Sequence, residues 1–211
     1  MRETDGILFD LDGTLWDAVE GICQGWNAGF QECGLEPVLT VPQLRSCMGL
    51  LMEDIAARIL PQIEDGARRM EIMEVCYRHQ LRYLGEHGGK LYPGVAETLE
   101  ELSGRVPLFI VSNCQDGYIQ CFLKVHRLEK YIRDFECPGR TGQAKAANIA
   151  LVARRNGLSA PVYVGDTQGD CDAAHGAGVP FFHAAYGFGS VDRAEGRIQA
   201  ISELTGLLTP P

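Results

Sequence analysis

Two aspartates, Asp10 and Asp12, follow the short apolar run Ile7–Phe9 and come directly before Gly13-Thr14. Alternate residues of an extended chain point to the same side, so the two carboxylates would project together. Two such anions repel each other unless a cation lies between them. Mg²⁺ meets this need, because it prefers oxygen ligands and is often held by one or two carboxylates together with a substrate phosphate. The pattern therefore predicts a magnesium site, with Gly13 leaving backbone amides open to an anion.

Other polar residues with suitable chemistry follow two further apolar runs or begin a helix. Ser112-Asn113 offers a hydroxyl and an amide that suit phosphate oxygens. Lys145 begins a predicted helix, where its charge adds to the positive end of the helix dipole. Asp166 and Asp170 are four residues apart, which suits one acid at a strand end and one on the first helical turn. Taken singly, each of these residues also fits a structural role, as a turn former, a helix cap or a surface charge.

The apolar runs are predicted to be strands buried on both faces, because they are short, rich in β-branched and aromatic residues, and bounded by turn formers. Helical periodicity lies between them, which favours a parallel sheet in an α/β fold. In such a sheet, ligands bind at the carboxyl ends of the strands, where these polar residues lie. The predicted strands are 7–9, 108–111, 162–164 and 179–183, with a weaker one at 131–135. One predicted helix begins after Gly94, and three others cover 119–125, 146–156 and 171–177.

The segment from residue 16 to residue 90 interrupts this alternation and shows no convincing strand. Apolar residues recur along it at helical spacing, as in Ile22, Trp26 and Phe30. This periodicity indicates about four helices. We therefore predict a core of residues 1–15 and 91–211, with an α-helical insertion at 16–90.

Composition limits the classes of protein to which the chain can belong. Its 211 residues, 45% hydrophobic and 22% charged, are typical of a globular protein with its own core. The net charge of −9 disfavours nucleic acid and anionic membranes as partners. No apolar run approaches the ~18 residues of a membrane span, and Asp10 interrupts any secretory segment. We expect a cytoplasmic protein whose eight scattered cysteines are reduced thiols.

Taken together, the motifs resemble those of the haloacid dehalogenase superfamily, and in particular its phosphohydrolases with an aspartate nucleophile. The resemblance covers essentially the whole chain and is nearest to the phosphoglycolate-phosphatase-like branch. It rests on Phe9–Leu15, Val111–Asn113, Gly142–Lys145 and Val164–Asp170, and on the glycine-rich stretch Tyr186–Gly189. It implies a Rossmann-like core with helices on both faces of the sheet and a small α-helical cap formed by the insertion.

The resemblance also implies how the residues act. Asp10 would attack phosphorus and form an aspartyl-phosphate, and Asp12 would protonate the leaving oxygen and then deprotonate water. Four acids would gather around Mg²⁺ at one edge of the sheet, with Asp12 contributing its backbone carbonyl. These acids are Asp10, Asp12, Asp166 and Asp170, and the implied phosphate ligands are Ser112, Asn113, Lys145, Gly13 and Thr14. The implied substrate is a small phosphorylated metabolite, and the implied assembly is a monomer or homodimer.

Related chemistries use similar motifs. Dehalogenases of the superfamily lack the second acid, so Asp12 argues against them, and the phosphonate-cleaving branch uses a cap lysine, whereas residues 16–89 contain none. Hexose-phosphate mutases share every core motif and are the nearest alternative. A phospho-accepting signalling switch is the alternative from a different class. In such switches an acidic pair precedes the phosphorylated aspartate by a whole βα unit, whereas here the candidate nucleophile comes first.

Substrate specificity would come from the helical insertion. A cap at the strand ends can close over the substrate and exclude water. Arg45 is the candidate to bind a second anionic or polar group of the substrate. The alternative is that Arg45 is an ordinary exposed helix arginine.

Overall fold

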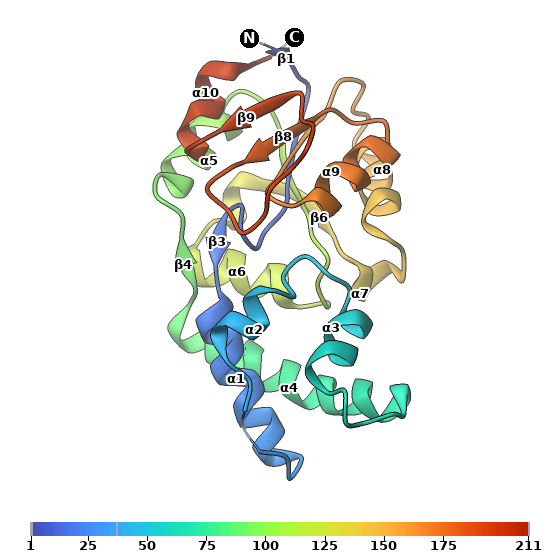
Figure 1. Cartoon of the computed structure of the whole chain (residues 1–211). Coiled ribbons are helices and arrows are strands. Elements are labelled where there is room, and N and C mark those ends of the chain that lie inside the picture. The colour runs from blue at the N-terminus through green and yellow to red at the C-terminus, as the bar shows by residue number, and fades with distance from the viewer. Residues whose placement is uncertain (1, 37, 211) are drawn as a thin grey trace.

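Six strands form a central sheet in which every neighbouring pair is parallel (Figure 1). In the computed structural model, which describes residues 2–36 and 38–210, the strand order is β6-β5-β2-β7-β8-β9. Because β2 lies between β5 and β7, the residues that follow these three strands are neighbours in space. The bounds are β2 (Ile7–Phe9), β5 (Leu108–Val111), β6 (Ile132–Glu136), β7 (Val162–Gly165), β8 (Phe181–Ala184) and β9 (Gly196–Ile198).

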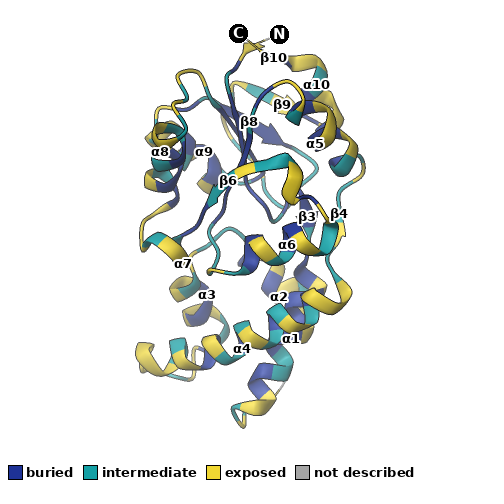
Figure 2. Cartoon of the chain, turned by 180° about the vertical axis from the view of Figure 1, so that it is seen from behind, coloured by how far each residue is buried: buried dark blue, intermediate teal, exposed yellow. Residues whose placement is uncertain are grey.

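Alternate residues of the sheet contribute to two separate apolar cores. Ile7 and Phe9 belong to the core that includes α5 (Val95–Ser103) and α6 (Tyr118–His126). Leu8 belongs to the other core, with α8 (Lys145–Arg155) and α9 (Gln168–Gly176). Figure 2 shows buried strands between these helices, with the edge strands β6 and β9 only partly buried. The predicted fold class, a Rossmann-like α/β core with helices on both faces of the sheet, is therefore confirmed.

Four helices inserted between β2 and α5 lie at the carboxyl ends of the strands (Figure 1), and we call residues 16–90, which contain them, the cap. Asn113, just beyond β5, donates from Nδ2 to the backbone oxygen of Gly49 in the cap at 3.1 Å. This contact is one of those that join the cap to the edge where the polar residues lie. The cap helices are α1 (Val19–Glu32), α2 (Val41–Arg45), α3 (Met52–Ile59) and α4 (Gly66–His87).

Two glycines allow α1 and α4 to pack in close contact. A Cβ atom on Gly25 would come within 2.6 Å of Gln80 Cα, and one on Gly29 within 2.5 Å of Cys76 Cα. Side chains at these positions would push the helices apart. The close packing brings Trp26 of α1 against Gln80 of α4, and both residues face the interior of the cap.

The ends of the insertion differ from the prediction that it contains no strand. β3 (Trp16–Asp17) pairs antiparallel with β4 (Lys90–Leu91). Strands of two residues are too short to show periodicity in a sequence. The pairing forms because the chain leaves the core and returns to it at one place, next to the predicted boundaries of the insertion.

Several other elements differ from the predicted ones at their ends, and some short elements have no predicted counterpart. α9 begins at Gln168 rather than at Cys171, because Thr167 and Asp170 form a capping box. The predicted strand 179–183 is observed as β8, displaced toward its C-terminal end. Within the described residues, every helix is too short or too polar to cross a membrane. The unpredicted elements are β1 (Arg2–Glu3), β9, β10 (Leu208–Thr209), α7 (Pro138–Thr141) and α10 (Leu204–Leu207).

Candidate active site

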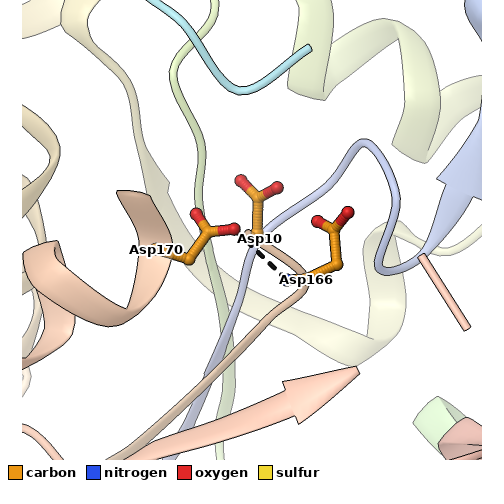
Figure 3. Close-up of side chains that lie close together, drawn as sticks. All are labelled: Asp10, Asp166 and Asp170. Carbon is orange, nitrogen blue, oxygen red and sulfur yellow. Dashed lines mark hydrogen bonds between the residues drawn. The ribbon is translucent and has the colours of Figure 1, made fainter. Parts of the chain in front are cut away.

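Three carboxylates meet at the carboxyl ends of β2 and β7. Asp10 follows β2, Asp166 follows β7, and Asp170 lies on the first turn of α9. One oxygen of each lies within 4.8 Å of the others, and all three residues are buried. Figure 3 shows the three side chains close together and directed to the same side of the sheet end. The structure thus brings these three predicted residues together at one edge of the sheet.

Lys145 neutralises part of the charge of this cluster. Its Nζ donates to Asp10 Oδ1 at 2.8 Å and to Asp170 Oδ1 at 2.5 Å. Burial alone would lower the pKa of Lys145, but the charges of the two aspartates outweigh it and raise the pKa well above its ordinary value. Lys145 therefore stays charged. One ammonium group among three carboxylates still leaves an excess of negative charge when all three are ionised.

Burial is the main influence on the acid strengths in the cluster. Burial and the charge of Asp170 raise the pKa of Asp10 to about 6, against the attraction of Lys145. Burial and the neighbouring aspartates raise the pKa of Asp166 to about 8. Burial also opposes the ionisation of Asp170, but Lys145 and Thr167 outweigh it and hold its pKa below the usual range. Without a further cation, the cluster therefore retains protons near neutral pH.

The donor set fits a hard divalent cation. Asp166 accepts hydrogen bonds from Phe188 N at 2.7 Å and from Thr14 Oγ1 at 3.4 Å. In the described part of the chain, no cationic side chain forms an ion pair with it. Asp10 and Asp166 are therefore the candidate ligands for such an ion, which prefers carboxylate oxygens. Asp170 has a supporting role beside these two ligands, because its two oxygens already accept hydrogen bonds from Lys145 and Thr167.

Two glycines make room for the Asp166 side chain. Gly13 has a φ of +88°, and a Cβ atom there would overlap the Asp166 carboxylate. A Cβ atom on Gly187 would overlap Asp166 from the other side. The loop after β8 thus packs directly on this acid, and its residue Phe188 also binds the carboxylate. In the sequence, the role of this loop is visible only as a resemblance to a glycine-rich stretch.

The carboxylate of Asp12 lies outside the cluster of the other three acids, and the implied contact of Asp12 with the ion is through its backbone carbonyl. Tyr118 Oη donates to Asp12 Oδ1 at 2.8 Å and holds it toward α6. Asp12 lies in the loop beyond β2, where the alternation of an extended strand no longer applies. Burial and the charge of Asp10 raise its pKa to about 8, so it carries a proton at neutral pH. Tyr118 was not predicted, because its position on α6 is typical of a core residue.

The implied phosphate ligands lie at the same edge but have protein partners. Ser112 is buried, and its side chain lowers the pKa of Asp10. Asn113 uses Nδ2 to bind Gly49, so its buried Oδ1, which has no partner among the described residues, is an acceptor rather than the expected donor. Thr14 is fully buried and binds Asp166, so its hydroxyl supports an acid of the cluster instead of facing a phosphate.

Arg45 is bound by other parts of the protein in this arrangement. Its Nη2 forms an ion pair with Asp17 Oδ2 at 2.9 Å. Its guanidinium carbon lies 4.9 Å from the centre of the Phe188 ring. Arg45 thus links the cap to β3 and to the loop after β8. Neither contact could be predicted from the sequence, because both partners are remote from Arg45 along the chain.

Replacing Lys145 by methionine should destabilise the fold in a pH-dependent way. Removing one partner of a buried ion pair costs roughly 3 kcal/mol, and here it leaves Asp10 and Asp170 without their cation. Their pKa values in the folded state then rise, so the loss of stability is large at pH 8 and shrinks as the pH falls to 5. Urea denaturation of Lys145→Met at both pH values measures this. The exposed Lys124→Met is the control, and equal stability of the two variants would contradict the prediction.

Comparison with known proteins agrees with this geometry. The model of the haloacid dehalogenase-like hydrolase family matches residues 7–184. Phosphoglycolate phosphatases from Aliivibrio fischeri and Vibrio parahaemolyticus are 29% and 30% identical over 192 and 199 residues. Each alignment covers 86% of this chain and 84% of the relative.

Solved structures show the same fold. A haloacid dehalogenase-like family hydrolase from Streptococcus pneumoniae superposes with a TM-score of 0.83 at 22% identity. The match covers 98% of this chain and 99% of the other. The family match spans the motifs that supply Asp10, Lys145 and Asp166. The chain therefore belongs to the haloacid dehalogenase-like hydrolase family and, within it, is similar to phosphoglycolate phosphatases.

Proposed function

We propose that this protein is a Mg²⁺-dependent phosphatase that hydrolyses a small phosphorylated metabolite through an aspartyl-phosphate on Asp10. Its family membership makes it a phosphatase-type hydrolase. The finer proposal depends on two acids, two residues apart, that favour opposite protonation states. Asp10 binds Lys145 and has a pKa of about 6, whereas Asp12 binds Tyr118 and has a pKa of about 8. Such a difference between the pKa values of two neighbouring acids is typical of a nucleophile beside a general acid.

Asp10 has the properties that a nucleophile needs. Phosphate esters resist attack because both reactants are anionic, so catalysis depends on positioning and charge neutralisation. Lys145 binds Oδ1 of Asp10, which fixes the carboxylate and leaves Oδ2 for the attack on phosphorus. The pKa of about 6 keeps Asp10 ionised at neutral pH. Lys145 and Ser112 then face the oxygens of the transferring group.

Asp12 is suited to move the proton. It carries the proton that the leaving oxygen needs, because its pKa is about 8. After that transfer the same carboxylate is a base that can take a proton from water as the water attacks the aspartyl-phosphate. Tyr118 holds it in place during both steps.

Asp10 and Asp166 would hold the divalent ion, with Asp170 fixing Lys145 beside them. When bound, the ion supplies positive charge that offsets the charge on the phosphoryl group. The cap, residues 16–90, would act as a separate unit that covers this edge and excludes water. The contact between Asn113 and Gly49 supports that arrangement.

A panel of small phosphorylated metabolites, assayed for inorganic phosphate with and without Mg²⁺, tests the proposed function. We expect release that EDTA abolishes. Faster transfer of phosphate to a sugar hydroxyl than to water would indicate a mutase instead. A stable aspartyl-phosphate without turnover would indicate a signalling switch, an alternative that family membership disfavours.

Mg²⁺ should bind more tightly as the pH rises from 6 to 8. The pKa of Asp166 is about 8 and that of Asp10 about 6, so binding below pH 8 must displace protons. For each proton that must be displaced, the dissociation constant of Mg²⁺ rises by up to about tenfold for every unit by which the pH falls. The dissociation constant, taken from the rise in unfolding temperature at pH 6, 7 and 8, measures this. An affinity that does not change with pH, or that Asp166→Asn leaves intact, would contradict the assignment.

A further inference from the structure

We infer that the leaving group of the substrate is an uncharged alcohol that carries a hydroxyl, so that phosphorylated carboxylic acids are poor substrates. This inference rests on the proposed phosphatase function and adds the class of substrate. It comes from the space between the cap and the core on the side of Asp12, where a general acid must meet the leaving oxygen.

A small cavity of about 40 Å³ lies next to Asp12. Its size admits only a few atoms, so it would take the part of the leaving group nearest the phosphate. The cap supplies an apolar wall for it, made of Ile22, Trp26, Leu44, Met48, Met52 and Ile55. A carboxylate placed against this wall would lose its hydration without gaining a charged partner, which is strongly unfavourable.

The polar groups that line the cavity suit a hydroxyl. Trp26 Nε1 donates to Gln80 Oε1 at 2.5 Å, which orients the carboxamide and leaves its NH₂ group as a donor. Asn113 Oδ1 is a buried acceptor with no partner in residues 2–36 and 38–210. A hydroxyl both accepts and donates hydrogen bonds, so it can satisfy either group, whereas a carboxylate can only accept. A carboxylate near Asn113 would face another oxygen.

The approach from solvent is acidic. Outer cavities of about 450 and 570 Å³ share Met52, Met70, Gln115 and Gly139, and the first also reaches Asn113. Among the described residues, the charged side chains that line them are all carboxylates: Glu53, Glu71, Glu74 and Asp116. Lys145 can meet the charge of the phosphoryl group at the strand ends. Glu71 is paired with Arg68 at 2.7 Å and Asp116 with Arg140 at 4.0 Å, so the acids without an ion pair among residues 2–36 and 38–210 are Glu53 and Glu74. A second anion on the leaving group would face these two carboxylates.

Arg45 does not add a positive charge to the lining of these cavities. It is the cap residue that the sequence favours for binding a second anion, but it is paired with Asp17 and stacked on Phe188. It lines none of the three cavities. The leaving-group side of the site is therefore apolar, neutral or acidic.

Two matched pairs of substrates test the inference. Glycerol 3-phosphate is compared with 3-phosphoglycerate, and 2-hydroxyethyl phosphate with 2-phosphoglycolate, because each pair exchanges a CH₂OH group for a carboxylate. We expect kcat/KM to be about tenfold or more higher for the hydroxyl member of each pair. Equal or faster turnover of the carboxylates would overturn the inference and leave the phosphatase function intact. Faster turnover of ethanolamine phosphate than of 2-hydroxyethyl phosphate would also overturn it, in favour of a cationic leaving group.

The proposed function itself is checked separately with p-nitrophenyl phosphate, whose leaving group has no carboxylate. Mg²⁺-dependent turnover that Asp10→Asn removes shows that the phosphatase is working, so the ratios within the pairs can be interpreted. Absence of such turnover, together with absence of phosphate release from the whole metabolite panel, would overturn the phosphatase function, and the inference with it.

A charge-introducing variant locates the specificity in the cavity. Met52 lines all three cavities and is half-buried, and lysine is of similar length. Met52→Lys should raise kcat/KM for the carboxylate members, relative to their hydroxyl partners, by about tenfold. Val38→Lys adds the same charge at a site that is 70% exposed and should leave the ratio unchanged. An unchanged ratio in Met52→Lys, with the fold confirmed by thermal unfolding, would overturn the assignment.

Discussion

Asp10→Asn should abolish phosphatase turnover, with kcat falling by at least about 10⁴-fold, because an amide cannot form the aspartyl-phosphate. Asparagine keeps the size of the side chain, and its oxygen can still accept the hydrogen bond from Lys145. The substitution therefore removes the nucleophile without leaving a cavity. Steady-state phosphate release from the best substrate of the panel measures the effect. Trapping of radiolabelled phosphate on the acid-quenched protein shows whether the intermediate forms.

The control for Asp10→Asn is Asp54→Asn, which removes a carboxylate from the exposed face of α3. It should turn over substrate at the rate of the unmodified protein. Thermal unfolding of both variants shows whether a loss of activity is a loss of fold. If Asp10→Asn keeps its turnover and its phosphoryl label, Asp10 is not the nucleophile and the mechanism proposed for this site is wrong.

The core of the site could be predicted because its position follows from local patterns and one topological rule. Strands β2, β5 and β7 are short apolar runs, and parallel strands place their carboxyl ends at one edge. Asp10 and Asp166 follow two of these strands directly, so their meeting depends on strand order alone. Asp170 joins them because the first turn of α9 brings it back toward the strand end.

The orientation of side chains in the loops could not be predicted in this way. Asp12 is only two residues beyond Asp10, yet its direction is set by Tyr118, which lies 106 positions away in the chain. Arg45 is likewise held by Phe188, a residue of the loop after β8. Such contacts form only when separate elements pack together. The sequence therefore identifies which acids are present but not which of them face the same ion.

The general-acid role predicts that Asp12→Ala will slow the hydrolysis of alkyl phosphates by about 10²–10⁴-fold. An alkoxide is a poor leaving group and needs the proton that Asp12 carries at neutral pH. Nitrophenolate leaves readily without a proton, so phosphorylation of Asp10 by p-nitrophenyl phosphate should be much less affected. Rapid-mixing kinetics of this variant should therefore show a burst of about one nitrophenolate per active site. Slow turnover should follow, because no base remains to activate water.

Tyr118→Phe tests whether the orientation of the Asp12 carboxyl group matters, because the group itself is kept. The variant keeps Asp12 but removes the 2.8 Å hydrogen bond that holds it toward α6. We expect the same preference for the aryl over the alkyl substrate, with a smaller loss than in Asp12→Ala, because the carboxyl group is still present but less well oriented. A general disturbance of the fold would slow both substrates equally. Equal losses on the two substrates in both variants would therefore contradict the general-acid role and leave Asp12 as a structural residue.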